Sequence, residues 1–153
     1  MAFLSLNPTQ PDQTVRLTGR ASIKADWKEK SAVFAIGSVA YSAIEILWRG
    51  YTHWTMSITG GICFSILYAV NTACPSRRLW KKCVIGSATI TSIEFAVGCI
   101  VNLWLKWNVW DYSQRPLNLM GQVCVLYTVL WYFLSIPIAG LSSLLKKRVF
   151  HHE

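Results

Sequence analysis

Residues 84–96 read VIGSATITSIEFA, and residues 35–47 read AIGSVAYSAIEIL. In each stretch an Ile-Gly-Ser triplet is followed by an Ile-Glu pair at the same spacing. One glutamate therefore interrupts each of two apolar runs, Glu45 in the first and Glu94 in the second. A carboxylate within a membrane-spanning helix costs about 3 kcal/mol or more, so such a residue is rare and usually functional. The match predicts an internal repeat and a shared polar site.

The composition is that of an integral membrane protein. Of 153 residues, 53% are hydrophobic and only 14% are charged, whereas a soluble domain carries about 25% charge. The net charge of +8 does not indicate nucleic acid, because the basic residues lie at the ends of apolar runs and not along one stripe. The sequence therefore predicts a multi-pass protein of the cell membrane, in contact with membrane lipid and not with nucleic acid.

Four apolar runs are each close to the ~20 residues that a membrane-spanning helix needs. They cover about 31–48, 55–74, 83–105 and 118–145. Pro137 predicts a kink or an early end in the fourth. We expect an all-α bundle of four transmembrane helices, built from two repeated helical hairpins. A flexible cytoplasmic tail over residues 1–30 would precede this membrane domain over 31–145, and a basic cytoplasmic tail over 146–153 would follow it.

The positions of the basic residues predict the orientation of the helices. All but three of the 15 lysines and arginines fall in the N-terminal tail, in the loop between the second and third runs, or at the C-terminus. Only Arg49, Lys106 and Arg115 fall on the opposite side. Positively charged loops stay in the cytoplasm, so both termini are expected there.

Polar residues in the first and third runs follow helical spacing, so each set shares one face of its helix. The sets are Ser38, Ser42, Glu45 and Arg49, and then Ser87, Thr91, Glu94 and Gly98, with Asn102 one turn further on. One interpretation is a polar cavity that opens outward, with the two carboxylates facing across it. The other is structural: Glu45 pairs with Arg49, Glu94 bonds Asn102 or a neighbouring helix, and residues such as Gly37 and Gly86 let helices pack closely.

The segment before the fourth run is rich in polar and aromatic residues. Residues 107–122 read WNVWDYSQRPLNLMGQ, and we expect this loop to form the lid or rim of the site. The candidate ligand or ion-binding residues are Glu45, Arg49, Glu94, Asn102, Asp111, Tyr112, Asn118 and Gln122. The five cysteines form no C-x-x-C pair, so no metal site is predicted.

A family resemblance rests on residues that span the chain. They are Glu45, Glu94-Phe95, Trp110-Asp111-Tyr112-Ser113, Asn118, Gly121, Gln122 and Trp131, over roughly residues 33–135. This pattern resembles the family named putative ABC-transporter type IV, which includes the vertebrate transmembrane protein 229 group. Arg49-Gly50-Tyr51 resembles a family segment, but the proline-rich stretch that follows in other members is replaced here by THWTMSITGG over residues 52–61.

The resemblance implies transport. The chain has no G-x-x-x-x-G-K-[ST] loop, so an ATPase would have to be a separate chain. We therefore favour a membrane transport or ligand-binding component whose glutamates bind a proton, a cation or a cationic solute. An enzyme acting on a lipid-like substrate through Glu45, Glu94 and Asp111, or a non-catalytic assembly protein, are the alternatives. The expected partner is a second copy of the chain in a homodimer, a separate ATPase or a transporter subunit. The sequence indicates no cofactor.

Overall fold

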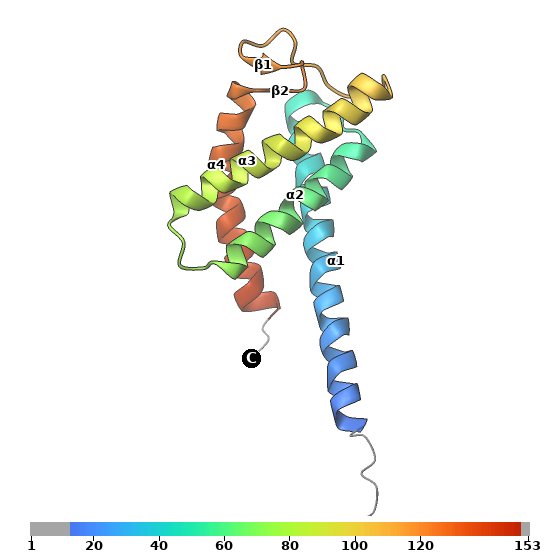
Figure 1. Cartoon of the computed structure of the whole chain (residues 1–153), viewed down its shortest axis with the longest axis vertical. Helices are drawn as coiled ribbons and strands as arrows, with labels where there is room; N and C mark the ends of the chain where they lie inside the picture. The colour runs from blue at the N-terminus through green and yellow to red at the C-terminus, as the bar shows by residue number, and fades with distance from the viewer. Residues whose placement is uncertain (1–12, 151–153) are drawn as a thin grey trace, which may run out of the picture.

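The computed structural model describes residues 13–150, with side chains from residue 26 onward. The ends of the two predicted tails, residues 1–12 and 151–153, lie outside this range. The order of elements is four long helices, with a short two-stranded ribbon before the last helix. Helices α1 to α4 and both strands are labelled in Figure 1.

Helices α1 and α2 form the first hairpin. α1 extends over Gln13–Arg49 and so begins well before residue 31, because no proline interrupts the chain between these positions. It ends at Gly50, whose φ of +80° is a conformation that glycine adopts at little cost. α2 extends over Trp54–Ala73, and His53 caps it by accepting a hydrogen bond from the Thr55 N–H.

Helix α3 extends over Leu79–Gly98 and continues into a wider π-helical turn, η1, over Cys99–Trp104. The Leu105 N–H donates to the Ile100 carbonyl five residues earlier at 2.9 Å, which is the π-helical pattern. Strands β1 (Asn118–Leu119) and β2 (Val123–Cys124) then pair antiparallel.

The last helix begins later than the sequence suggests. α4 covers Val125–Leu144 and is followed by a second π-helical turn, η2, over Leu145–Val149. The expected start at residue 118 is wrong, because the backbone of residues 118–124 is used in the β1–β2 ribbon. Pro137 lies inside the helix and does not end it.

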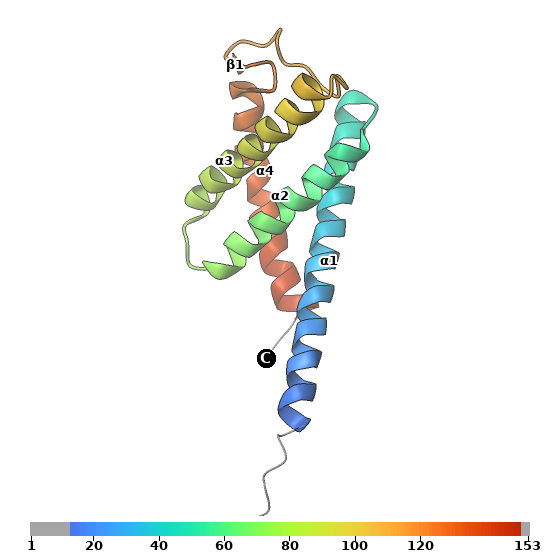
Figure 2. The same ribbon diagram turned by 45° about the vertical axis from the view of Figure 1, so that its right-hand side comes forward.

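The four helices pack as a bundle in which α1 lies along α2 and α3 lies along α4, while α2 also packs against both α3 and α4. Figure 2 shows the same arrangement from a second direction. Glycines allow these close approaches: a Cβ at Gly37 would overlap Phe64 of α2, and a Cβ at Gly86 would overlap Ser135 of α4. This agrees with the structural interpretation of the small residues.

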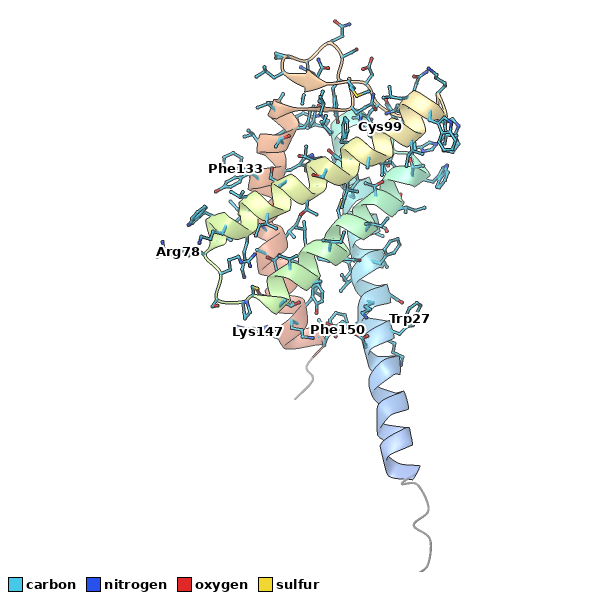
Figure 3. All side chains as sticks on the ribbon, viewed as in Figure 1. Trp27, Arg78, Cys99, Phe133, Lys147 and Phe150 are labelled. Carbon is cyan, nitrogen blue, oxygen red and sulfur yellow. The ribbon has the colours of Figure 1, made fainter. Side chains whose placement is uncertain are left out.

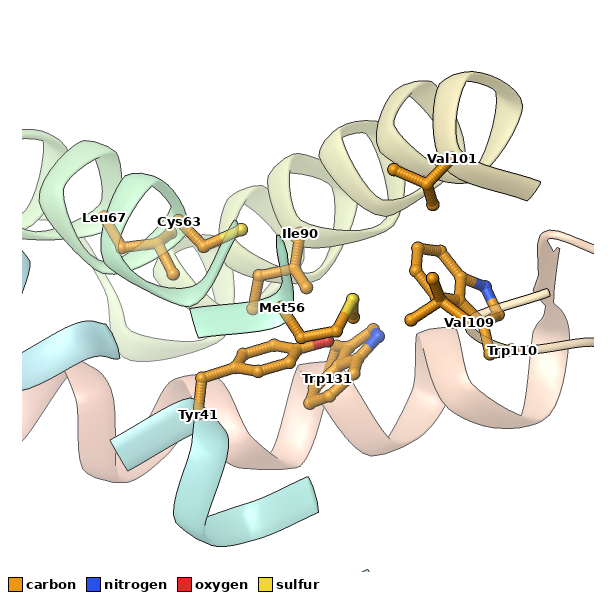
Figure 4. Close-up of a cluster of buried hydrophobic side chains, with 9 residues drawn as sticks. All are labelled: Tyr41, Met56, Cys63, Leu67, Ile90, Val101, Val109, Trp110 and Trp131. Carbon is orange, nitrogen blue, oxygen red and sulfur yellow. The ribbon is translucent and has the colours of Figure 1, made fainter. Parts of the chain in front are cut away.

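The core lies where the helices cross and where the 105–117 loop folds back. Its residues, drawn in Figure 4, are Tyr41, Met56, Cys63, Leu67, Ile90, Val101, Val109, Trp110 and Trp131. Many large apolar side chains face outward, among them Leu47, Trp104 and Phe133. Outward apolar surface on this scale is typical of contact with lipid.

Four helical segments are long and apolar enough to cross a membrane: Asp26–Arg49, Trp54–Ala73, Leu79–Trp104 and Val125–Val149. The predicted four-helix bundle is thus confirmed, and the molecule is a small four-helix membrane protein. The α2–α3 turn and the end of α4 lie toward one end of the bundle, and Figure 3 shows Arg78 and Lys147 there. The orientation in the membrane and the internal repeat stay predictions.

Candidate functional site

Glu94 is the most deeply buried carboxylate among residues 26–150, with 3% of its surface exposed. It lies on α3 and accepts two hydrogen bonds, one from the Tyr41 hydroxyl of α1 and one from Trp131 Nε1 of α4 at 2.8 Å. Burying a polar group costs free energy unless it is hydrogen-bonded, and these two donors offset that cost. The carboxylate therefore joins three helices, while no basic residue in the described part of the chain forms an ion pair with it.

Glu45 has a different environment. It forms an ion pair with Arg49, one turn further along α1, and accepts a hydrogen bond from the Thr52 hydroxyl at 2.9 Å. Arg49 also donates to the Val109 carbonyl at 3.1 Å. The half-buried pair is thus fixed between α1 and the loop after α3. The two glutamates that match in sequence differ in their partners, because only Glu45 has a basic neighbour on its own helix.

A cavity of about 360 Å³ lies between α1 and α4, at the end of the bundle where α1 ends and α4 begins. Its volume is within the size range of small-molecule sites. Its charged lining is Glu45 and Arg49. Six aromatic side chains make up much of the rest: Tyr41, Trp48, Tyr112, Tyr127, Trp131 and Phe133. Below we call this cavity the aromatic pocket. Glu94 does not line the pocket, but Tyr41 and Trp131, which donate hydrogen bonds to it, both do. Glu94 therefore lies directly behind these two side chains.

The aromatic rings hold one another in place. The Tyr112 and Tyr127 rings stack with their centroids 4.4 Å apart, and Tyr41 stacks on Trp131 at 5.8 Å. Trp48 Nε1 donates to the Tyr127 hydroxyl at 3.1 Å, which joins α1 to α4. Burial raises the pKa of Tyr112 above its ordinary value, so this hydroxyl stays protonated and can donate a hydrogen bond.

The remaining candidates shape the loop and do not line the pocket. Asn102 and Gln122 bond each other at 2.8 Å, and Asn102 also accepts from the Val109 N–H. Asn118 donates to the Ser113 and Arg115 carbonyls and accepts from the Gly121 N–H. Of the eight candidates, Glu45, Arg49 and Tyr112 line the pocket and Glu94 lies behind it.

The sequence interpretation missed several pocket residues, namely Tyr41, Trp48, Tyr127 and Phe133. Two of them could have been found, because Tyr41 and Trp48 lie four residues before and three residues after Glu45 and therefore share its helix face. Trp131 appeared in the family pattern but without a role. Among residues 26–150, no three His, Cys, Asp or Glu side chains gather as a metal ion would require.

Asp111 stabilises a turn of the loop, and the hydrogen bonds of its carboxylate predict the direction in which its pKa is shifted. Its carboxylate accepts hydrogen bonds from the Ser113 N–H and the Ser113 hydroxyl, both at 2.8 Å, and these donors lower the Asp111 pKa. The stability that this gives the turn is present above the ordinary pKa of about 3.9 and is lost as the pH falls through the lowered value.

Carbon-13 NMR of the Asp111 carboxyl in detergent micelles measures this pKa directly. In the Ser113→Ala variant, which loses the hydroxyl donor, we expect the pKa to return part of the way to its ordinary value. An unshifted pKa in the wild-type protein would contradict the bonding of this turn.

Comparison with known proteins identifies the family. The family model described as Putative ABC-transporter type IV matches residues 33–151, which is well over half of the chain and includes the aromatic pocket. No curated protein and no solved structure gives a significant match. With this match over residues 33–151, the chain belongs to the Putative ABC-transporter type IV family.

Proposed function

We propose that the protein is a membrane transport component that binds a cationic solute in the aromatic pocket. The observation that carries this proposal is Glu94, a buried carboxylate with neutral hydrogen-bond partners, placed directly behind Tyr41 and Trp131. Aromatic faces attract cations, and quaternary ammonium groups are the ligands that pockets of several aromatic rings recognise best. Hydrogen bonds from these rings to a carboxylate increase the electron density on their faces and strengthen this attraction.

The charges around the pocket also favour a cation. The positive charge of Arg49 is matched by Glu45 in the same ion pair. In the proposed bound state Glu94 is ionised, so the group formed by these three side chains carries one excess negative charge. An incoming ammonium group restores neutrality in a site where the electrostatic interaction is only weakly screened by water.

The transport part of the proposal follows the family description. Because the chain has no phosphate-binding loop of the P-loop type, ATP hydrolysis would belong to a separate subunit. The pocket, which lies at the end of the bundle opposite the basic segments, would then lie on the outer side of the membrane.

The proposal is tested with choline as the probe. We expect saturable binding of radiolabelled choline by equilibrium dialysis of the protein in nanodiscs of phosphatidylglycerol, which supplies no competing ammonium head group. Its neutral isostere 3,3-dimethyl-1-butanol has the same shape without the charge. It should compete at least about tenfold more weakly, since a desolvated cation–π interaction contributes about 2 kcal/mol.

Two results would overturn this function. The first is that choline shows no saturable binding to the folded protein. The second is that the neutral isostere competes as well as choline, because the pocket would then recognise shape alone and Glu94 would have no electrostatic role.

A further inference from the structure

A second cavity adjoins the aromatic pocket and is lined mainly by α1, α2 and α4. It has a volume of about 260 Å³ and shares with the pocket Tyr41, Ile44, Trp131, Leu134 and Pro137. It extends from there to Ile36 on α1 and Leu141 on α4, and its lining is almost entirely apolar. We call it the apolar groove. The two cavities therefore adjoin, with the charged and aromatic pocket on one side of these shared residues and the apolar groove on the other.

The groove is narrow. Its lining residues on α1 run from Ile36 to Ile44, which is about 12 Å at 1.5 Å per residue. A volume of about 260 Å³ over that length gives a mean cross-section of about 20 Å². A helix with its side chains is about 10 Å across, so a helix from a second copy of the chain does not fit inside. A single hydrocarbon chain does.

The groove is also open toward the surrounding lipid. α1 and α4 approach each other mainly through long side chains, such as the Tyr41–Trp131 and Trp48–Tyr127 pairs. Ile44 and Leu141, which line the groove from the two helices, are 36% and 38% exposed. An occupant can therefore enter sideways from the bilayer without the helices separating first.

From this geometry we infer that the ligand is an amphiphile with a cationic, quaternary-ammonium head group and one apolar chain. The head group lies in the aromatic pocket and the chain lies in the apolar groove. The inference rests on the proposed function for the head group and adds the chain, for which the carrying observation is that the two cavities adjoin and share five lining residues. The change of polarity from the aromatic pocket to the apolar groove matches the change of polarity along such a molecule.

The length of the chain is the variable to test. Ethyl-, butyl-, hexyl- and octyltrimethylammonium, used as free monomers, compete with radiolabelled choline for the protein in phosphatidylglycerol nanodiscs. Each methylene that enters the groove contributes about 0.8 kcal/mol relative to water. We therefore expect the free aqueous concentration for half-displacement to fall about fourfold per added methylene, until the groove is filled.

A matched pair of variants separates the groove from simple partition into the bilayer. Ala40 lines the groove but not the pocket, and Ala43 is exposed on the same helix and lines neither. Ala40→Phe should bind choline like wild type but gain nothing from longer chains, whereas Ala43→Phe should keep the full dependence on chain length. If Ala40→Phe fails to fold, Ala40→Leu fills the groove with a smaller side chain.

The outcomes separate the inference from the function on which it rests. Choline binding with equal affinities for all four chain lengths in wild type overturns the inference and leaves the proposed function intact. A dependence on chain length that survives in Ala40→Phe also overturns it. Absence of choline binding overturns both. A gain of about fourfold per methylene in wild type and Ala43→Phe, lost in the Ala40 variant, supports the inference.

Discussion

Glu94→Gln is expected to weaken choline binding by at least about tenfold while the protein stays folded. Glutamine has nearly the shape of glutamate, and its amide oxygen can still accept the hydrogen bond from Trp131 Nε1 while its NH₂ donates to the Tyr41 oxygen. The variant loses the negative charge that lies directly behind Tyr41 and Trp131 of the aromatic pocket. A loss of about 1.4 kcal/mol corresponds to tenfold, and the attraction of a desolvated cation is about 2 kcal/mol or more.

Glu29→Gln is the matched control for this variant. Glu29 is also buried, and it also accepts a hydrogen bond from a tyrosine hydroxyl, that of Tyr68, but it lies near Lys146 at the other end of the bundle. Equilibrium dialysis should give wild-type choline affinity for this control. Equal choline affinities for wild type and the Glu94 variant would remove the electrostatic basis of the proposed function.

Gly60→Ala is expected to lower the free energy of unfolding by about 1–3 kcal/mol, the range for overpacking a close interface. A methyl group at this position in α2 would overlap the Tyr41 Cβ and lie 2.9 Å from the Gly37 carbonyl oxygen of α1. Neither atom is the end of a flexible side chain, so the two helices must move apart. Because Tyr41 lines the pocket and bonds Glu94, choline affinity should fall as well.

Gly140→Ala is the control for the same chemical change in a helix. Gly140 lies in α4, and a Cβ there has nothing within 4 Å. With no clash, alanine should leave stability unchanged or raise it by up to about 1 kcal/mol through its higher helix propensity. Unfolding of the two variants in sodium dodecyl sulfate, followed by circular dichroism, measures the difference. If Gly60→Ala were as stable as wild type, α1 and α2 would not pack as closely as described.

The four helices could be predicted from the sequence because each is a long apolar run with basic residues at one end. The start of the fourth helix could not. Residues 118–124 read NLMGQVC, which is apolar enough to look like the first turns of a helix. The hydrogen bonds that make it a ribbon instead depend on Gly121, which has a φ of +69°, and on contacts with the loop.

The polar stripes predicted part of the site. The ion pair between Glu45 and Arg49 lies within one helix, so helical spacing reveals it. The partners of Glu94 come from α1 and α4 and can be known only from the packing of three helices. Regular helical spacing puts Asn102 on the same stripe as Glu94, but Asn102 lies in the π-helical turn η1. That turn changes the residue spacing. Asn102 therefore forms hydrogen bonds with Gln122 and Val109 and not with Glu94.

The two hydrogen bonds to Glu94 have a kinetic consequence. Tyr41 belongs to the first hairpin and Trp131 to the second, so one carboxylate connects two halves that otherwise meet mainly through α2. Any motion that separates α1 from α4 must break one of these bonds as well as the bond from Trp48 to Tyr127, so the lifetime of the packed arrangement depends in part on the Glu94 side chain. We expect a bound cation, which strengthens the polarisation of both rings, to prolong that lifetime and so to slow its own release.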